Sequence, residues 1–598
     1  MKMLLSGNEA VARGAWEAGV TVATAYPGTP STEILETIGM LCREDIYSEW
    51  SPNEKVAFEV AIGSSVAGAR SLVCMKHVGL NVAADPFMTF AYTGVKGGFV
   101  VVSADDPSMH SSQNEQDNRY YAKFGIIPML EPSDSQESKD LLIAAYDLSE
   151  KFDTPVLFRM VTRISHSKGV VEIGDRQNHE PEGFQKDITK YVMVPGHAKL
   201  RRKIVLERLE KLKEFAETTP LNFIEEGRRD IGIITSGISY EYAKEIMPDA
   251  SYLKLGLSYP LPEKKIREFA KSVERLYIIE ELEPFLEEQI KAMGVACEGK
   301  KYFTNYGELS PSEVIEGFVN AGELSIENIK TREPEKLFPR PPVLCPGCPH
   351  RGIFTALKKL KVPVTGDIGC YTLGALSPLN VIDTCVCMGA SVGNAIGMAK
   401  VGKEKKGVVA AIGDSTFLHS GITGLLDAVY NKANIVVIIL DNRITAMTGG
   451  QQHPGTGKTL MGEDTYQVNF KELCTALGVR DIHEVDAYDL EASKKALQAA
   501  LDYDGPSVVL TSRPCALMPA KIKETPYVVL ADECNGCKLC FKIGCPAIAA
   551  SDEKTEKGHP KAIIDQDLCT GCTICAQVCP MDCIVRSDSS AVKEGARV

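Results

Sequence analysis

The sequence lacks long apolar segments and an excess of positive charge, the two features that would point to a membrane or a nucleic acid. No apolar run approaches the roughly 18 residues that a spanning helix needs, and the runs at 408–412 and 435–440 are typical of buried strands. Lys and Arg total 66 against 79 Asp and Glu. The resulting net charge of −13 disfavours nucleic acid or an anionic membrane as the main partner.

The opening of the chain also lacks the apolar core of a signal peptide, because MKMLLSGNEAV turns polar after five residues. Together these absences predict a cytoplasmic protein without a membrane or nucleic-acid partner.

The chain is too long for a single hydrophobic core, and 598 residues predict roughly three to five domains. Strand-like and helical segments alternate with glycine-rich turns, which indicates α/β domains. The charged stretch 197–215 predicts a surface helix between domains. We expect α/β blocks at 1–165, 166–335 and 343–520, a linker at 331–342 and a cysteine-rich domain at 526–588.

Cysteine is abundant, with 19 residues, of which nine lie between Cys534 and Cys583. In a large chain without a signal peptide, such clustering indicates metal or cluster ligation in preference to disulfides. Two similar units start 35 residues apart: Cys-x2-Cys-x2-Cys-x4-Cys-Pro at 534 and Cys-x2-Cys-x2-Cys-x3-Cys-Pro at 569. A pair of zinc sites is the alternative, but zinc sites rarely combine this triple spacing with a trailing Cys-Pro.

The spacing predicts two [4Fe–4S] clusters, because each cysteine before proline leaves its own unit to bind the other cluster. One cluster takes Cys534, Cys537, Cys540 and Cys579, and the other takes Cys569, Cys572, Cys575 and Cys545. The tail thus resembles the two-cluster bacterial ferredoxins. The x4 spacing departs from their pattern, so the loop before Cys545 must bulge, and this ligand is the one in doubt. Cys583 is predicted to be a small buried side chain.

A second set of polar residues follows two buried strands. Gly413, Asp414 and Ser415 end the strand 408–412, and Asn442 follows the strand 435–440. Glycine at a strand end lets a diphosphate approach the backbone, and Asp414, Asn442 and the carbonyl of Ile444 are suited to a hard cation such as Mg²⁺. Ligands generally bind at the carboxyl ends of parallel strands in open α/β sheets.

These residues resemble the thiamine-diphosphate signature, although Ser415 and Asp441 stand where that pattern usually has glycine and asparagine. The following Thr448-Gly449-Gly450-Gln451 resembles the 2-oxo acid:ferredoxin oxidoreductases. In that family, cysteines in matching contexts hold a further [4Fe–4S] cluster beside the cofactor. The resemblance places it on Cys345, Cys348, Cys370 and Cys515. A redox dithiol or zinc half-site at Cys345 and Cys348, with Cys515 inert, is the alternative. The remaining cysteines are expected to be structural.

The first block resembles the domain that binds the aminopyrimidine. Tyr26-Pro27-Gly28-Thr29-Pro30 is similar to a family motif whose threonine lies near the substrate carboxylate. A buried carboxylic acid is needed to activate the pyrimidine, and Glu59 fits this role, with Glu54 as its rival. Small residues at 63, 64 and 67 are expected to bury Glu59. The loop residue His110, with Arg119, His419 and His453, gives weaker candidates for substrate contact.

The order of domains resembles the large subunit of the indolepyruvate:ferredoxin oxidoreductases across nearly the whole chain. That resemblance implies oxidative decarboxylation of indolepyruvate and other arylpyruvates with coenzyme A, giving aryl-acetyl-coenzyme A, carbon dioxide and reduced ferredoxin. It also implies a smaller beta subunit in an α2β2 assembly. Pyruvate or branched-chain 2-oxo acids are alternative substrates, and a non-oxidative thiamine decarboxylase or a pure electron-transfer subunit are alternatives from other classes.

Overall fold

The computed structural model describes the chain except residues 326–337, 339, 403–406, 519–523 and 590–598. The chain divides into two units, Met1–Pro334 and Glu335–Val598. Most of the expected linker 331–342 lies outside the described residues. In the described parts of the chain, no helix is both long and apolar enough to cross a membrane.

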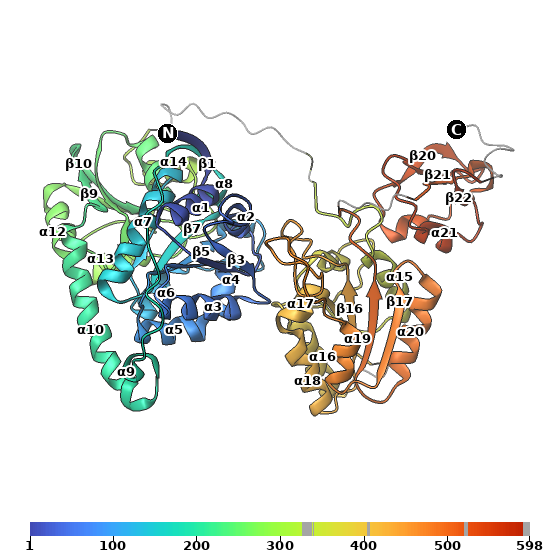
Figure 1. The fold of residues 1–598 in the computed structure, drawn as a ribbon. Helices are drawn as coiled ribbons and strands as arrows, with labels where there is room; N and C mark the ends of the chain where they lie inside the picture. Colours follow the sequence, from blue (N-terminus) through green and yellow to red (C-terminus); the bar gives the residue numbers. More distant parts are fainter. Residues whose placement is uncertain (326–337, 339, 403–406, 519–523, 590–598) are drawn as a thin grey trace. The chain divides into compact units, whose positions relative to one another are not determined.

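A seven-stranded sheet organises the first unit (Figure 1), with the strand order β12-β6-β7-β5-β4-β2-β3. All neighbours are parallel except β12 and β6. The strands are β2 (Val22–Ala25), β3 (Tyr47–Trp50), β4 (Ser71–Lys76), β5 (Phe99–Asp105), β6 (Met129–Leu130), β7 (Val156–Val161) and β12 (Leu257–Tyr259). Helices α3 (Glu54–Val66) and α5 (Ala84–Thr93) bury their apolar residues against one face of this sheet.

The N-terminal domain continues beyond the boundary expected at residue 165. Strand β8 (Lys168–Glu172) pairs with β1 (Lys2–Ser6). The helix expected at 197–215 is confirmed as α10 (Pro195–Thr218). Arg201 of this helix donates to the carbonyl of Tyr92 at 2.7 Å, so α10 is fastened to the end of α5.

The middle block has its own four-stranded sheet, in the order β13-β10-β11-β9. Its strands are β9 (Asn222–Glu225), β10 (Arg228–Ser236), β11 (Ala250–Leu255) and β13 (Arg275–Ile279). Its helices are α11 (Ile238–Ile246), α12 (Glu263–Ser272), α13 (Phe285–Ala292) and α14 (Pro311–Asn320). Strand β12 from this block completes the first sheet, and Phe58 and Phe285 belong to one shared core. The two blocks therefore form one unit.

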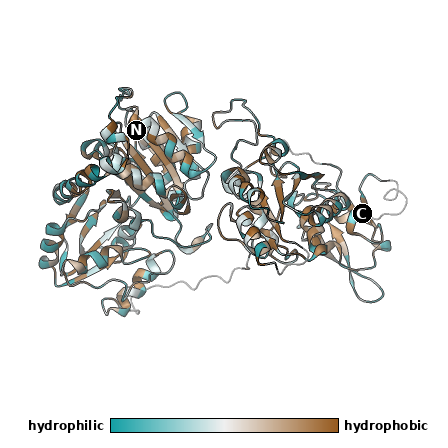
Figure 2. Ribbon diagram, turned by 90° about the horizontal axis from the view of Figure 1, so that it is seen from below, coloured by the Kyte–Doolittle hydropathy of each residue, from teal (hydrophilic) through white to brown (hydrophobic). Residues whose placement is uncertain are grey.

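A five-stranded parallel sheet, ordered β14-β15-β16-β18-β17, organises the second unit. Its strands are β14 (Val364–Thr365), β15 (Val409–Gly413), β16 (Val436–Asp441), β17 (Asp481–Asp486) and β18 (Ser507–Ser512). Helices α15 (His350–Leu360) and α20 (Leu490–Asp502) cover one face, and α16 (Ala390–Val401) and α18 (Ile422–Tyr430) cover the other. Burial on both faces explains why the central strands are mainly apolar, as in the Val and Ile run of β16, and they are drawn as brown strands in Figure 2.

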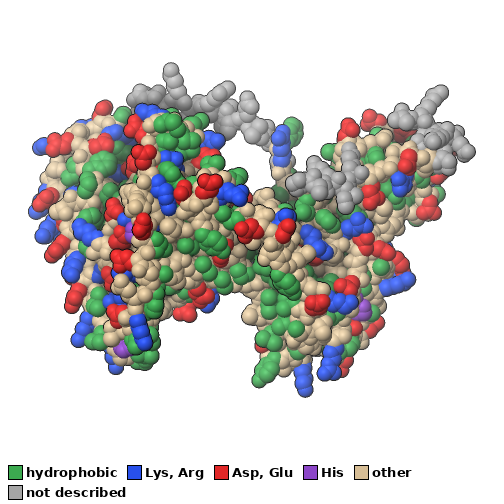
Figure 3. Space-filling model, in the orientation of Figure 1, with side chains coloured by type: hydrophobic (Ala, Val, Ile, Leu, Met, Phe, Trp, Pro, Cys, Tyr) green, Lys and Arg blue, Asp and Glu red, His purple; other side chains and the backbone are tan. Residues whose placement is uncertain are grey.

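The cysteine-rich tail is a small α+β domain built from two antiparallel strand pairs. Strand β19 (Tyr527–Val529) pairs with β22 (Ile584–Arg586), and β20 (Ile548–Lys554) pairs with β21 (Pro560–Ile564). The short helices η6 (Cys540–Ile543) and α21 (Ile574–Val578) carry cysteines into its core. The expected combination of α/β domains with a ferredoxin-like α+β domain is confirmed. Acidic and basic side chains are interspersed on the face drawn in Figure 3.

Candidate active site and cysteine centres

The carboxyl ends of β15 and β16 bring Asp414 and Asn442 to one edge of the sheet. The strands are parallel neighbours with Gly413 opposite Leu440, so the residues that follow each strand meet. Asp414 is 2% exposed and Asn442 7%. An added Cβ at Gly413 would lie 2.6 Å from the ring of Tyr371, which explains why glycine ends the strand. A helical segment begins at Asp414, contains a π-turn at Phe417–Gly421 and continues into α18.

The hydrogen bonds of this edge hold carboxylate oxygens inside the protein. Asp414 accepts from the backbone N–H of Ser415 and of Arg443, both at 2.9 Å, and its Oδ2 lies 3.3 Å from Nε2 of His453. Burial opposes ionisation of Asp414, but the hydrogen bond and charge of His453 outweigh it and lower its pKa. For Asp441, burial and the charge of Asp414 raise the pKa. Asp414 is therefore the ionised member of this pair and a suitable ligand for a hard cation.

Asn442 is positioned by contacts that the motif alone does not reveal. Its Oδ1 accepts from the N–H of Ile444 at 3.1 Å, and its Nδ2 lies 3.4 Å from Nε2 of His350. Burial lowers the pKa of His350 to about 4, against the charge of Asp414, so the imidazole is neutral near pH 7. His350 directly follows Cys348-Pro349 in the sequence. Its contact with Asn442 therefore connects the cysteine motif to the cofactor motif, and only the fold reveals this contact.

The loop after β16 folds back toward Asp414. Thr445 donates to the hydroxyl of Ser415 at 2.9 Å. Thr448 hydrogen-bonds to Gln451 through its side chain and accepts at its carbonyl from Gln451 Nε2 at 2.9 Å. Gly449 has a φ of 122°, which favours glycine. The Thr448–Gln451 motif thus forms a compact turn beside the Asp414 edge.

Asp367 is a buried site residue that the sequence analysis did not single out. It lies just after β14, is fully buried, and accepts from the N–H of Gly389 at 2.8 Å and of Ser391 at 3.0 Å. These contacts fix the N-terminus of α16 near the same edge of the sheet. The sequence feature that could have identified Asp367 is its position, two residues after the short strand β14.

The expected burial of Glu59 is wrong. Glu59 is exposed (45% for its side chain) and pairs with Lys55. The nearby Gly63 does not pack closely, since an added Cβ would meet no atom within 4 Å. Glu54 is the buried carboxyl of α3, 5% exposed, and its Oε1 would lie 2.7 Å from a Cβ added at Gly79. Of the two candidate carboxyl groups on α3, Glu54 is therefore the buried one.

Thr29 lies beside a buried lysine that the sequence analysis missed. Lys76 lies at the end of β4 and packs against Gly28. A side chain at Gly28 would crowd it, because an added Cβ there would lie 3.0 Å from the Cβ of Lys76. Its ammonium donates at 2.6 Å to the carbonyl of Ser111, whose hydroxyl donates to the carbonyl of Thr29 at 3.4 Å. Burial lowers the pKa of Lys76 to about 8, although Asp106 raises it. A cation that titrates near neutrality thus borders the Tyr-Pro-Gly-Thr motif.

Arg119 is not available as a substrate contact within its unit. It is 1% exposed and forms ion pairs of 2.6 Å with both Asp117 and Glu280. Its role is structural, because Glu280 belongs to the middle block and the Arg119–Glu280 pair links that block to the first one. His110 is half-exposed and lies 3.2 Å from Glu308.

The four cysteines of the expected cofactor-side cluster act on one another electrostatically, and two of them, Cys345 and Cys515, line one cavity. The pKa of Cys370 is raised to about 11, mainly by burial and to a smaller extent by the charges of Cys515 and Cys345. Burial raises the pKa of Cys348 to about 12, and Cys370 and Cys345 act in the same direction. Such thiols are protonated until a metal centre draws off their protons, as cluster ligands require. In the described part of the chain, no three His, Cys, Asp or Glu side chains are arranged for a single metal ion.

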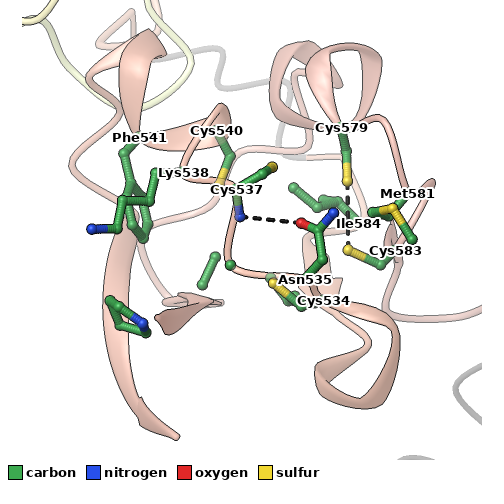
Figure 4. Close-up of a pocket in the computed structure, with 14 residues that line it drawn as sticks. Cys534, Asn535, Cys537, Lys538, Cys540, Phe541, Cys579, Met581, Cys583 and Ile584 are labelled. Carbon is green, nitrogen blue, oxygen red and sulfur yellow. Dashed lines mark hydrogen bonds between the residues drawn. The ribbon is translucent and has the colours of Figure 1, made fainter. Parts of the chain in front are cut away.

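The first tail set surrounds one pocket (Figure 4), which is lined by Cys534, Cys537, Cys540 and Cys579. Burial raises the pKa of Cys540 to about 11, and the charges of the other three add to this. Cys583 is 2% exposed and its Sγ lies 3.5 Å from that of Cys579. Cys583 is buried, as expected, but it also lies directly beside the predicted ligands.

The second tail set lines another cavity, which contains Cys545, Cys569, Cys572 and Cys575. The x4 spacing is accommodated by Gly544, which has a φ of 65° and follows the η6 turn. Burial raises the pKa of Cys545, and the nearby Cys569 adds to the effect. The bulged loop therefore still delivers Cys545 to the side of its three expected partners.

Three family models match the chain. Residues 13–209 match the pyruvate flavodoxin/ferredoxin oxidoreductase, thiamine diphosphate-binding model. Residues 367–510 match the C-terminal TPP-binding domain of thiamine pyrophosphate enzymes, and residues 562–585 match the 4Fe-4S binding domain.

Several curated relatives are similar over almost the whole chain. Indolepyruvate oxidoreductase subunit IorA of Archaeoglobus fulgidus is 43% identical, covering 97% of this chain and 96% of the relative. Indolepyruvate oxidoreductase subunit IorA of Pyrococcus horikoshii is 42% identical, again covering 97% of this chain and 96% of the relative. A solved 2-oxoglutarate:ferredoxin oxidoreductase from Magnetococcus marinus matches with 17% identity and a TM-score of 0.45, over 54% of this chain and 65% of that one. On the strength of the curated relatives and the family models, this chain belongs to the IorA family of thiamine-diphosphate-dependent 2-oxo acid:ferredoxin oxidoreductases.

Proposed function

We propose that the chain is the large subunit of an enzyme that oxidatively decarboxylates arylpyruvates, indolepyruvate above all, to the aryl-acetyl-coenzyme A. One contact carries the oxidative part of the proposal: the N–H of Cys515 donates at 2.9 Å to the carbonyl of Asn442. A residue of the cysteine centre is thus bonded directly to a residue of the cofactor edge. This adjacency supports electron removal from the cofactor and disfavours a non-oxidative decarboxylase.

Asp414, Asn442 and the carbonyl of Ile444 would hold Mg²⁺, and the backbone around Gly413 and Ser415 would approach the diphosphate. Thr448 and Gly449 would close the same edge, and Thr29 would face the substrate carboxylate. When bound, thiamine diphosphate supplies the nucleophilic carbon and the electron sink for loss of carbon dioxide. The buried Glu54 would share a proton with the pyrimidine nitrogen, in the role first considered for Glu59.

Glu54→Gln should retain thiamine diphosphate but lose turnover by roughly 100- to 10,000-fold, the usual contribution of a positioned acid or base. The amide keeps the shape of the side chain while removing its exchangeable carboxyl proton. Turnover and bound thiamine should be measured on the same anaerobic preparation. Glu59→Gln is the matched control on the same helix and should stay near the wild-type rate. The reverse pattern would return the role to Glu59.

A smaller partner subunit should complete the enzyme, in an α2β2 complex of the cytoplasm that reduces ferredoxin. Expressed alone, the chain should bind iron yet show little coenzyme-A-dependent oxidation of indolepyruvate. Adding the partner should restore oxidation, and arylpyruvates should be preferred over pyruvate, branched-chain 2-oxo acids and 2-oxoglutarate when initial rates of ferredoxin reduction are compared. Full activity of the isolated chain at its monomer mass would refute the partner, and a preference for pyruvate would refute the substrate class.

A further inference from the structure

Arg351 lies between two cysteine centres and fastens both of their loops. It belongs to the first turn of α15 and is 1% exposed. One amino group of the guanidinium, Nη2, donates to the carbonyls of Leu344 at 2.7 Å and Cys345 at 3.1 Å. The other, Nη1, donates at 2.6 Å to the carbonyl of Ile543, two residues before Cys545. The same side chain therefore holds the cofactor-side loop and the tail loop.

The two loops are closely packed around this arginine. A Cβ at Gly347 would collide with the hydroxyl of Thr570, and a Cβ at Gly544 would lie 2.8 Å from Pro378 and 3.5 Å from Nη1 of Arg351. Arg351 also lines the cavity that contains the second tail set of cysteines. Arg351 is thus packed against both loops, next to a separate cavity that Cys345 and Cys515 line together with Cys569 and Cys572.

Among the residues that the structure describes, no carboxylate balances the charge of Arg351. In the described residues the guanidinium forms no ion pair with Asp or Glu, and its Nε has no hydrogen-bond acceptor. A buried cation normally requires a negative partner, because burial without one is costly. Burial raises the pKa of Cys348, Cys545 and Cys572, and Arg351 acts in the opposite direction on all three. The negative groups that its charge reaches are therefore cysteine sulfurs of both centres.

We propose that Arg351 is the shared counter-charge of the cofactor-side cluster and the second tail cluster, and that it raises the reduction potentials of both. The inference rests on the proposed ligation of both clusters. A cluster with four thiolate ligands is anionic and gains one negative charge on reduction. A nearby buried cation stabilises the reduced form more strongly, so it raises both reduction potentials. The cluster on Cys534, Cys537, Cys540 and Cys579 lies outside this contact and should not respond.

The test is a potentiometric titration of the complete anaerobic complex, followed by electron paramagnetic resonance. In Arg351→Met and Arg351→Gln, two of the three clusters should become harder to reduce. At the wild-type midpoint their reduced-to-oxidised ratio should fall at least tenfold, which corresponds to ~59 mV for one electron. Arg351→Lys keeps the charge and should recover most of the shift. Arg267→Met is the control, because Arg267 belongs to the first unit and is balanced by Glu263 at 2.6 Å, and it should leave all three potentials unchanged.

Unchanged potentials in both neutral variants, with all clusters retained, would overturn the proposal. If the neutral variants lose cluster iron, Arg351→Lys decides: retention of iron supports the counter-charge, whereas equal loss in all three variants shows a purely structural clamp and overturns it. Failure of the underlying ligation would be seen separately, as a missing cluster in the wild-type complex before any variant is made.

Discussion

Replacing Asp414 by alanine should abolish binding of thiamine diphosphate and Mg²⁺ while leaving the iron content near the wild-type value. The carboxylate is ionised, 2% exposed and held by two backbone N–H groups, so its removal deletes the charge that a hard cation needs. Turnover should fall by roughly 100-fold or more, since even residues that only orient metal ligands are worth 10–100-fold. Thiamine, magnesium and iron should be assayed on the same sample.

Asp441→Asn is the matched control for this variant. Asp441 lies beside Asp414 on the same edge, and its Oδ2 accepts from the hydroxyl of Ser512 at 2.9 Å. An asparagine there can still accept that hydrogen bond, and asparagine is the residue that the thiamine signature usually has at this position. The control should therefore keep cofactor and activity. Full thiamine content and turnover in Asp414→Ala would show that the cofactor site lies elsewhere.

Cys345→Ser should remove one cluster and nearly all oxidation, while the two tail clusters remain. Iron in the anaerobically purified wild-type chain should approach roughly twelve atoms, four for each [4Fe–4S] cluster, and should fall to about eight in the variant. The reason is that the proposed ligand set groups Cys345 with Cys348, Cys370 and Cys515, whereas the complete tail sets line two further cavities. Iron analysis and electron paramagnetic resonance of the same sample provide the measurement.

Cys297→Ser, at a half-buried cysteine of the first unit that belongs to none of the proposed ligand sets, should leave iron unchanged. Iron near eight in the wild type, equal in Cys345→Ser, would restrict the clusters to the tail. It would also favour the alternative reading of Cys345 and Cys348 as a dithiol.

The sequence predicted those features whose geometry is local. Asp414 and Asn442 each follow a continuous apolar strand, and parallel neighbours bring strand ends together whatever else the chain does. The tail cysteines are sorted into sets by spacing and by the proline that follows each unit. Even Cys545 lines the cavity of its set, because Gly544 adopts a left-handed conformation that turns the chain after η6.

Features that depend on packing between distant segments could not be predicted. Glu54 and Glu59 are five residues apart on α3, so they point about 140° away from each other at 100° per residue. Which one is buried depends on the backbone at Gly79, and nothing in the helix itself reveals that contact. For the same reason the sequence does not reveal that β12 adds to the edge of the first sheet. It also does not reveal the ion-pair partners of Arg119.

Anaerobic rapid mixing of the complete complex with indolepyruvate, with and without coenzyme A, tests the central claim most directly. The clusters should bleach within a single turnover as electrons leave the substrate, and coenzyme A should accelerate the bleaching. Pyruvate and 2-oxoglutarate should bleach them more slowly under the same conditions. Release of carbon dioxide from indolepyruvate while the clusters stay oxidised would contradict the account and identify a non-oxidative decarboxylase.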